Sequence, residues 1–213
     1  CGITITANGV DYTYDYDPGD VWKTNNYTAL TTTSLWTAPT TADPFAAFKT
    51  VKDAIRAKTG DELTVAIMNT YTFNLMTATD AMKNRYLSTS GISLGYLTDA
   101  EAKAVVQGTS GLQVAVYDKQ YKDESGVAHS FVPDGYVCLI PSGNLGNTWY
   151  GTTPEEADLQ GSNSAEVSIV NTGVAISREI QNHPVNINTF ASEIVLPSFE
   201  RMDSVGVLKV VGE

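Results

Sequence analysis

The sequence has few of the residues on which metal centres and disulfide-stapled folds depend. Its 213 residues include two cysteines, Cys1 and Cys138, and two histidines, His129 and His183. Two cysteines form no disulfide framework, and Cys138 lies in an apolar stretch, so we predict a buried, unreactive thiol there. Neither histidine has a cysteine, a histidine or a carboxylate at ligand spacing, which disfavours a zinc site. We therefore expect no metal and no cofactor, in a reducing compartment.

Long apolar runs and an excess of basic residues are also missing. No apolar run approaches the roughly 20 residues that a membrane-spanning helix needs, and no signal peptide is visible. Thirteen Lys and Arg against twenty-four Asp and Glu give a formal net charge of −11 at pH 7. Because nucleic-acid binding depends on cations that neutralise phosphates, this charge disfavours a broad nucleic-acid-binding surface and leaves room only for a local basic patch.

The short motifs that frame catalytic residues are absent as well. No serine stands in a nucleophile elbow, and Gly143–Gly146 is not followed by the Lys-Ser or Lys-Thr of a phosphate-binding loop. The acidic stretch Asp15–Asp20 does not have the glycine and glutamate positions of an EF-hand loop. The adjacent Glu155 and Glu156 follow Thr-Pro, which is typical of a helix start. We expect no catalytic activity.

The residues that are present describe an ordinary globular protein. Apolar residues make up 42% of the chain and charged residues 17%, both close to the average of soluble domains. A chain of this length buries roughly 70% of its unfolded surface, as one large domain or two small ones. Strand and helix patterns interleave without a regular βαβ repeat, which predicts an α+β fold.

The clearest helix is predicted for Asp43–Thr59. Asp43 is a good N-cap, Pro44 suits the first helical position, and Gly60 follows the last turn. Lys49, Lys52 and Arg56 form a basic stripe on this helix, and four of the thirteen basic residues lie between positions 49 and 58. We expect the stripe to be exposed, either as a solvated face or as a surface that meets an anionic partner. The neighbouring apolar face consists of Phe45, Phe48, Val51 and Ile55.

The other patterns predict a hairpin at Gly2–Tyr16, a second helix from Asn69 or Thr70 to Leu87, and a third from the capping box at Thr98 to Gly108. Tyr27–Thr41 is predicted as a loop with some extended structure, and Asp118–Ser130 as a polar loop or hairpin tip. Strands are predicted at Leu63–Met68, Leu112–Tyr117, Tyr136–Ile140, Val185–Val195 and Val205–Val211. Ala165–Ile180 also has strand character, either as a hairpin around Asn171 or as one long strand with a bulge.

Two stretches carry a resemblance to a known family. They are PDGYVCLIPSGNLGNTWYGTTPEEADL at residues 133–159 and SEIVLPSFERMDSVGVLKV at residues 192–210. Both are similar to the major capsid protein E family of lambda-like tailed bacteriophages, and weaker similarity extends back to about Gly2. The resemblance covers nearly the whole chain.

The resemblance implies the tailed-phage major capsid fold, an α+β fold with a spine helix in a peripheral domain and an axial domain around a mixed sheet. By segment, residues 1–61 would be the peripheral-domain part with the spine helix. Residues 62–190 would be the axial domain, and residues 191–213 the return strands to the peripheral domain. The family's N-terminal arm and extended loop have no counterpart, so we expect a fragment that is a monomer or small oligomer by itself.

The resemblance also implies a function. The protein would be a structural subunit of a phage or prophage icosahedral capsid, assembling in the bacterial host cytoplasm and enclosing packaged DNA. Its partners would be other copies, a decoration protein and packaged DNA without sequence-specific contact, with no membrane. Lys49, Lys52 and Arg56 then become subunit-interface candidates that face an acidic patch on a neighbour.

The alternative is a carbohydrate-binding module or an uncharacterised hydrolase. Its support is the aromatic content, because Trp22, Trp36 and Trp149 would stack on sugar rings. The competing explanation is that these side chains pack in a core or an interface.

Overall fold

The computed structural model divides into two compact units, Cys1–Gly143 with Asp203–Glu213, and Asn144–Met202. This division by contacts differs from the predicted peripheral and axial segments, which concern places in an assembled shell and stay predictions. The described residues are 2–7, 10–15, 17–90, 97–123, 125–154, 167–171, 174–182 and 185–212.

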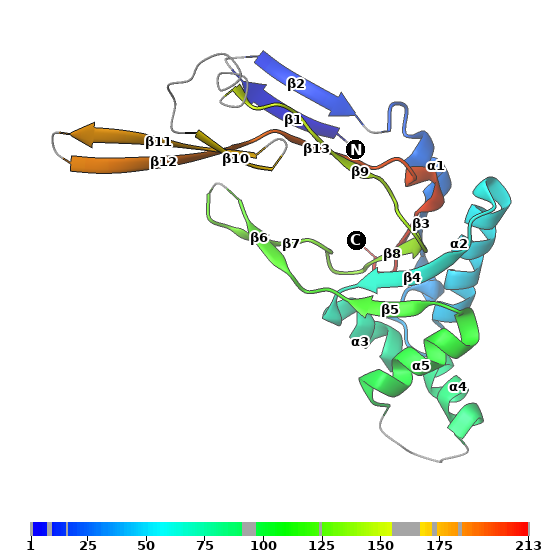
Figure 1. Cartoon of the computed structure of the whole chain (residues 1–213). Coiled ribbons are helices and arrows are strands. Elements are labelled where there is room, and N and C mark those ends of the chain that lie inside the picture. The colour runs from blue at the N-terminus through cyan, green and yellow to red at the C-terminus, as the bar shows by residue number, and fades with distance from the viewer. Residues whose placement is uncertain are drawn as a thin grey trace. The chain divides into compact units, whose positions relative to one another are not determined.

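A five-stranded mixed sheet forms the centre of the first unit (Figure 1). Two strand pairs, β3 with β14 and β4 with β5, are parallel, and the pairs that β8 makes with β14 and β4 are antiparallel. The α+β class and the mixed sheet expected from the sequence are therefore confirmed. In sheet order the strands are β3 (Tyr27–Ala29), β14 (Gly206–Lys209), β8 (Tyr136–Pro141), β4 (Leu63–Met68) and β5 (Gln113–Val116).

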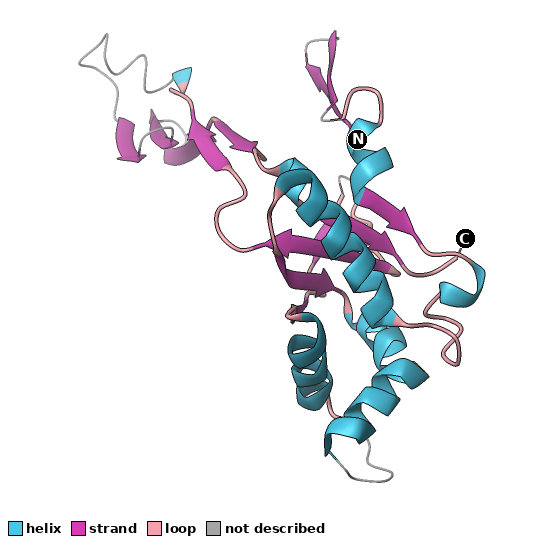
Figure 2. Ribbon diagram, turned by 90° about the vertical axis from the view of Figure 1, so that its right-hand side faces the viewer, coloured by secondary structure: helices cyan, strands magenta, loops and turns pink. Residues whose placement is uncertain are grey.

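One face of this sheet carries the helices, and α2 crosses the strands there (Figure 2). Most of the buried apolar residues described in this unit form one core cluster, which includes Phe48 and Ile55 of α2 and Leu139 and Leu208 of the sheet. The helices of the unit are α1 (Val21–Asn26), α2 (Pro44–Thr59), α3 (Thr70–Ala78), α4 (Asp80–Ser90) and α5 (Asp99–Ser110), and two 3-10 turns cover Thr32–Ser34 and Met202–Ser204.

The strands show which face is covered. In β8 the side chains of Val137 and Leu139 are fully buried, whereas Cys138 between them is only partly buried. Successive side chains of a strand point to opposite faces, so the helices cover the face of Val137 and Leu139. A register shift between Leu63 and Val65 in β4 lets Leu63 and Ala66 both join the core.

The loop before α2 supplies one of the largest core side chains. Trp36 is 1% exposed and meets Phe48 of α2 edge to face, with ring centroids 5.8 Å apart. Its backbone N–H donates to the carbonyl of Val210 at 3.0 Å, which fixes the loop against the end of β14. The sequence predicts a loop here but does not predict that it anchors the core.

The predicted second helix is wrong in one respect, because the chain forms two helices with Thr79 between them. Thr79 has an extended ψ of 144°, and the next backbone N–H, that of Asp80, donates to the carbonyl of Pro39 at 2.9 Å. The third helix runs to Ser110 rather than ending at Gly108, and Gly111 supplies the left-handed cap with φ 70°.

Two hairpins complete the first unit. β1 (Gly2–Ala7) and β2 (Val10–Asp15) pair antiparallel as predicted, although their Asn-Gly turn lies outside the described residues. β6 (Gln120–Lys122) and β7 (Ala128–Ser130) form the second hairpin, so the hairpin alternative for this polar stretch is confirmed.

The second unit consists mainly of strands. β9 (Asn147–Tyr150) pairs antiparallel with β13 (Val195–Ser198). A separate antiparallel sheet contains β10 (Val167–Asn171), β11 (Val174–Asn182) and β12 (Val185–Glu193), in that order. This confirms the hairpin alternative for the stretch around Asn171, whose turn residues lie outside the described part. The helix start predicted at Glu155 and Glu156 also lies outside it.

The contact between α2 and β14 gives a first testable prediction. A Cβ built at Gly206 would lie 2.5 Å from Cγ1 of Val51, and Val51 is β-branched and buried, so it has little room to move. We expect Gly206→Ala to lower the free energy of unfolding by about 1–3 kcal/mol through overpacking. Urea denaturation followed by circular dichroism measures this loss.

The matched control is Gly108→Ala in α5. Nothing lies within 4 Å of a Cβ built there, so alanine should stabilise the helix by about 0.5–1 kcal/mol. Equal stability of the Gly206 variant and the unchanged protein would mean that α2 does not pack tightly on β14.

Candidate functional site

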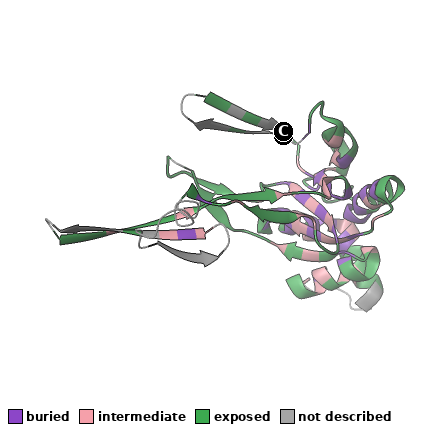
Figure 3. Cartoon of the chain, turned by 45° about the horizontal axis from the view of Figure 1, so that its top comes forward, coloured by how far each residue is buried: buried purple, intermediate pink, exposed green. Residues whose placement is uncertain are grey.

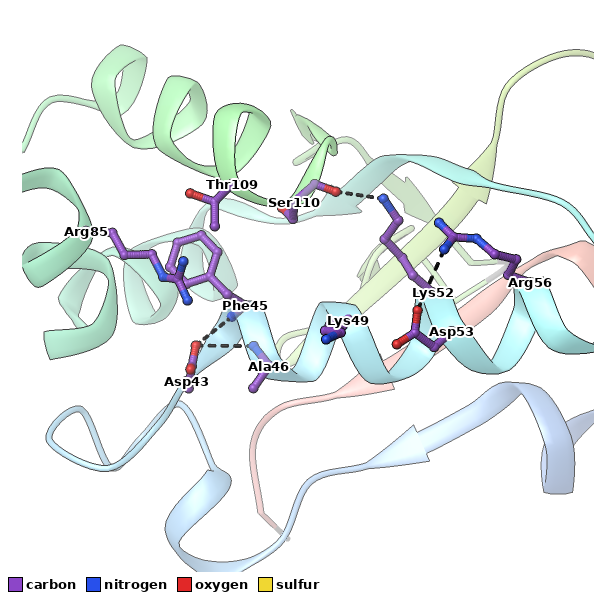
Figure 4. A pocket seen from close by; sticks show the side chains of 10 residues that line it. All are labelled: Asp43, Phe45, Ala46, Lys49, Lys52, Asp53, Arg56, Arg85, Thr109 and Ser110. Atoms are coloured by element: carbon purple, nitrogen blue, oxygen red, sulfur yellow. Dashed lines mark hydrogen bonds and ion pairs between the residues drawn. The ribbon is translucent and has the colours of Figure 1, made fainter. Parts of the chain in front are cut away.

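The predicted basic stripe lies on the outer face of α2, and the ends of this helix are fixed as the sequence predicts. The Asp43 carboxylate accepts from the backbone N–H groups of Phe45 at 3.0 Å and Ala46 at 3.2 Å (Figure 4). Gly60 ends the helix in the left-handed conformation. Because Phe45, Phe48, Val51 and Ile55 are all buried, Lys49, Lys52 and Arg56 turn away from the core.

Lys52 is the most enclosed of the three cations. Its side chain is 12% exposed, and its Nζ donates to the carbonyl of Ser110 at 2.7 Å. Ser110 is the last residue of α5, where helix carbonyls lack partners within the helix. Lys52 therefore joins the middle of α2 to the end of α5, and the prediction that all three cations are exposed is wrong for this residue.

Arg56 and Lys49 differ from Lys52 and from each other. Arg56 is half-exposed and forms ion pairs with Glu62 at 3.1 Å and Asp53 at 3.9 Å. Glu62 also lies 3.5 Å from Nζ of Lys52, so one carboxylate serves two cations. Lys49 has no hydrogen-bond or ion-pair partner within the described part of the chain, which leaves its charge available to a partner molecule.

These side chains line a groove of about 490 Å³ between α2, the middle of α4 and the end of α5 (Figure 4). Arg85 of α4 adds a fourth cation, and its guanidinium lies 4.4 Å from the ring centroid of Phe45. Asp43 and Asp53 are the two carboxylates among the lining residues, and Asp43 is engaged as the helix cap. The groove is therefore a local cationic surface on an acidic chain.

A second groove of about 400 Å³ lies on the sheet face that the helices leave uncovered. None of its lining residues carries a charge, and they include Ile67, Tyr117, Phe131, Val132, Cys138 and Val207. The prediction of a buried Cys138 thiol is confirmed only in part, because Cys138 is partly buried and lines this groove. Burial raises the pKa of the Cys138 thiol above its ordinary value.

The residues considered for chemistry are not brought together. No group of three or more His, Cys, Asp or Glu side chains that would hold a metal occurs in the described ranges. His129 pairs with Asp123 at 2.9 Å on the β6–β7 hairpin, and this hydrogen bond lowers the pKa of Asp123. His183 lies outside the described residues. Among the described helices, none has the length and apolar character needed to cross a membrane.

The acidic stretch Asp15–Asp20 has a structural role that the sequence does not reveal. The Asp17 carboxylate accepts from the backbone N–H groups of Trp22 at 2.7 Å and Lys23 at 2.9 Å, in the first turn of α1. Burial acts to raise the pKa of Asp17, but these hydrogen bonds to the ionised form outweigh it and the pKa lies below its ordinary value.

The burial of Trp36 removes it from any sugar-binding platform. Trp36 is buried in the core of the first unit, and Trp149 is 59% exposed on β9 of the second unit. A buried indole cannot stack on a sugar ring, so the alternative loses one of the three side chains on which it depends.

Comparison with known proteins identifies the family. The model of the phage major capsid protein E family matches residues 2–210. No curated protein matches the sequence significantly. A crystal structure assigned as the capsid protein of an E. coli prophage superposes with a TM-score of 0.66 at 16% identity, and the match covers 99% of this chain and 59% of that one.

A second solved structure, a phage-related protein from Bordetella bronchiseptica, matches with a TM-score of 0.54 at 12% identity. This match covers 87% of the chain and 55% of the other protein. At these identities the two structures show a shared fold, and the chain spans somewhat more than half the length of each.

The different settings of the cations predict different effects of substitution on stability. Lys52→Ala leaves the Ser110 carbonyl without its charged donor, so we expect the free energy of unfolding to fall by about 1.5–3 kcal/mol. Lys49→Ala should change it by at most about 0.5 kcal/mol. Lys52→Met keeps the aliphatic stem and separates the lost hydrogen bond from lost packing. Equal effects of the Lys49 and Lys52 variants in urea denaturation would contradict the conclusion that Lys52 stabilises the fold and Lys49 does not.

The raised pKa of Cys138 predicts slow labelling of its thiol. A Cys1→Ser variant lets this rate be measured without labelling of Cys1. Less of the thiol is ionised at pH 8 than in an ordinary cysteine, so labelling by iodoacetamide should be slower than that of a model peptide thiol. The rate should keep rising at pH values where the peptide has reached its plateau. A plateau at the peptide's pH would show that the groove does not desolvate the thiol.

Proposed function

Because the chain belongs to the phage major capsid protein E family, whose members are structural proteins and not enzymes, we propose that it is a subunit of an icosahedral phage or prophage shell. The observation that carries the proposal is the match of the family over residues 2–210. The shared fold with a prophage capsid structure supports it. The hydrolase and carbohydrate-binding alternatives have no comparable support.

Within this proposal, other copies of the same chain are the main partners, in the capsid of the virion and during assembly in the host cytoplasm. Packaged DNA would be enclosed without sequence-specific contact, because a chain with net charge −11 has few cations to place on phosphates. A decoration protein is a further expected partner. The spine-helix role of α2, in residues 1–61, and the axial role of residues 62–190 remain parts of the proposal, with residues 191–213 returning to the peripheral domain.

We further propose that the cationic groove on α2 is a contact between subunits. Lys49 has no partner within the described residues, and Arg56 and Arg85 extend the positive charge along the groove. A neighbouring copy of an acidic chain offers many carboxylates, and charge pairs at an interface favour the correct approach of two molecules. Lys52 belongs to the fold rather than to the contact, so its role as an interface candidate is indirect.

The proposal is tested by measuring self-association. We expect sedimentation velocity of the purified chain to show oligomers that grow with concentration, and negative-stain microscopy to show whether they include shells, tubes or small assemblies. Particles of capsid size would contradict the expectation of a monomer or small oligomer, and a chain that stays monomeric at its highest soluble concentration would count against the contacts between copies that are proposed for it.

The groove is tested by the double variant Lys49→Glu, Arg56→Glu. Its matched control is Lys23→Glu, Lys83→Glu, which changes the net charge equally at two exposed lysines outside the groove. We expect the groove variant alone to weaken self-association, while both melting temperatures stay near that of the unchanged protein because exposed pairs contribute about 0–1 kcal/mol. Equal weakening by both pairs would indicate a general charge effect.

A further inference from the structure

The face of the five-stranded sheet that points away from the helices presents a continuous row of partly buried apolar side chains. Val207, Cys138 and Ile67 are register partners on the adjacent strands β14, β8 and β4. Side chains of register partners point to the same face, and the row forms the floor of the uncharged groove of about 400 Å³. An apolar surface of this kind on a folded unit commonly marks an interaction site.

Aromatic side chains extend this surface onto the β6–β7 hairpin. Phe131 lines the groove and is 57% exposed. Its ring centroid lies 6.1 Å from that of Tyr117 and 5.1 Å from that of Tyr121, which is itself 48% exposed. Aromatic residues dominate the energetics of protein interfaces, so this wall adds contact area beside the floor.

Within the described residues of the second unit, part of the β11–β12 ladder has no third strand beside it. β10 pairs only with the first part of β11, up to Ser177. From the pair Arg178–Thr189 to the pair Asn182–Val185, the described ladder has two strands, β11 and β12. A two-stranded hairpin is marginally stable in water and needs an apolar partner surface. We call this segment, residues 178–182 with 185–189, the ribbon end.

The strand β12 is exposed along most of its length (Figure 3), and apolar side chains are among those exposed at the ribbon end. Val185 is 84% exposed and Ile187 is 59% exposed, and they lie two residues apart on one face of the strand. β12 carries no charged residue before its last position, Glu193. A long uncharged edge strand is a site at which other chains associate.

We propose that the ribbon end of one copy docks in the uncharged groove of a second copy, with Val185 and Ile187 against the row of Val207, Cys138 and Ile67. The lack of charge favours this pairing, because copies with a net charge of −11 repel one another, whereas the groove lining has no charged residue and β12 has none before Glu193. The two surfaces differ, so the contact is heterologous and can be repeated from copy to copy. The inference rests on the proposed shell function.

The first test is a photo-crosslinking benzoylphenylalanine placed at position 187, with a control probe at position 186 on the opposite face of β12. Isotopically heavy and light copies of the full chain are mixed, irradiated and digested. We expect the probe at 187 to yield heavy–light peptide pairs between β12 and the strands β4, β8 or β14. The probe at 186 should yield few such pairs.

Three results of this crosslinking experiment would contradict the docking proposal. Groove peptides found only as heavy–heavy and light–light pairs would place the ribbon end in the groove of its own chain and overturn the proposal. So would a lack of groove peptides while oligomers or shells form, and in that case the proposed function would still stand. Failure to self-associate at any concentration would overturn the docking proposal, whereas the shell function, for which this chain alone is expected to be a monomer or small oligomer, would still stand.

A second test compares two exposed apolar residues of the same hairpin, Phe131→Ser and Val127→Ser. Both side chains are more than half exposed, at 57% and 53%, and Val127 does not line the groove. We expect the Phe131 variant to weaken self-association about tenfold or more, the loss expected when a large apolar contact disappears. The Val127 variant should match the unchanged protein, and equal association of both variants would contradict the docking site.

Discussion

The one-sided covering of the five-stranded sheet is the constraint on which the rest of the first unit depends. α2 lies so close to β14 that Gly206 has no room for a side chain beside Val51. Once the inner face of α2 is fixed in this way, its outer face must carry Lys49, Lys52 and Arg56. The same covering leaves the opposite face of the sheet open, so the cationic groove and the uncharged groove both follow from the position of one helix.

The sequence was sufficient where local signals decide the structure. Asp43, Pro44 and Gly60 mark both ends of α2, and the structure shows the same cap residues. It was insufficient where a distant group decides. At the break between α3 and α4, Thr79 Oγ1 accepts from the N–H of Met82 at 3.4 Å, but the N–H of Asp80 donates to the carbonyl of Pro39, far away in the sequence, and no local pattern records that partner. Two glycines, Gly108 and Gly111, could each end α5. The helix continues through Gly108 and ends at Gly111, which has a positive φ.

In the candidate site, too, a distant group decides what the sequence could not predict, namely the different roles of the three cations. In sequence, Lys49, Lys52 and Arg56 are equivalent members of one stripe. Their difference comes from α5, whose last carbonyl lies beside Lys52 and leaves it 12% exposed. No pattern within α2 records where the end of another helix lies. The charge pattern therefore predicted the surface but not which of its cations holds the fold together.

The amino-acid composition of β8 indicates that the second face of the sheet is also covered in the assembled protein. Its residues Tyr136–Ile140 form a continuous apolar run, a pattern typical of strands that are covered on both faces. In the folded unit only the face of Val137 and Leu139 is fully buried, and Cys138 remains partly exposed. A strand with one permanently solvated face has no need of apolar residues on both sides. The composition of β8 thus matches a sheet whose second face is covered in the assembled state, and an uncharged strand from a neighbouring copy is the partner that an acidic shell protein can place there.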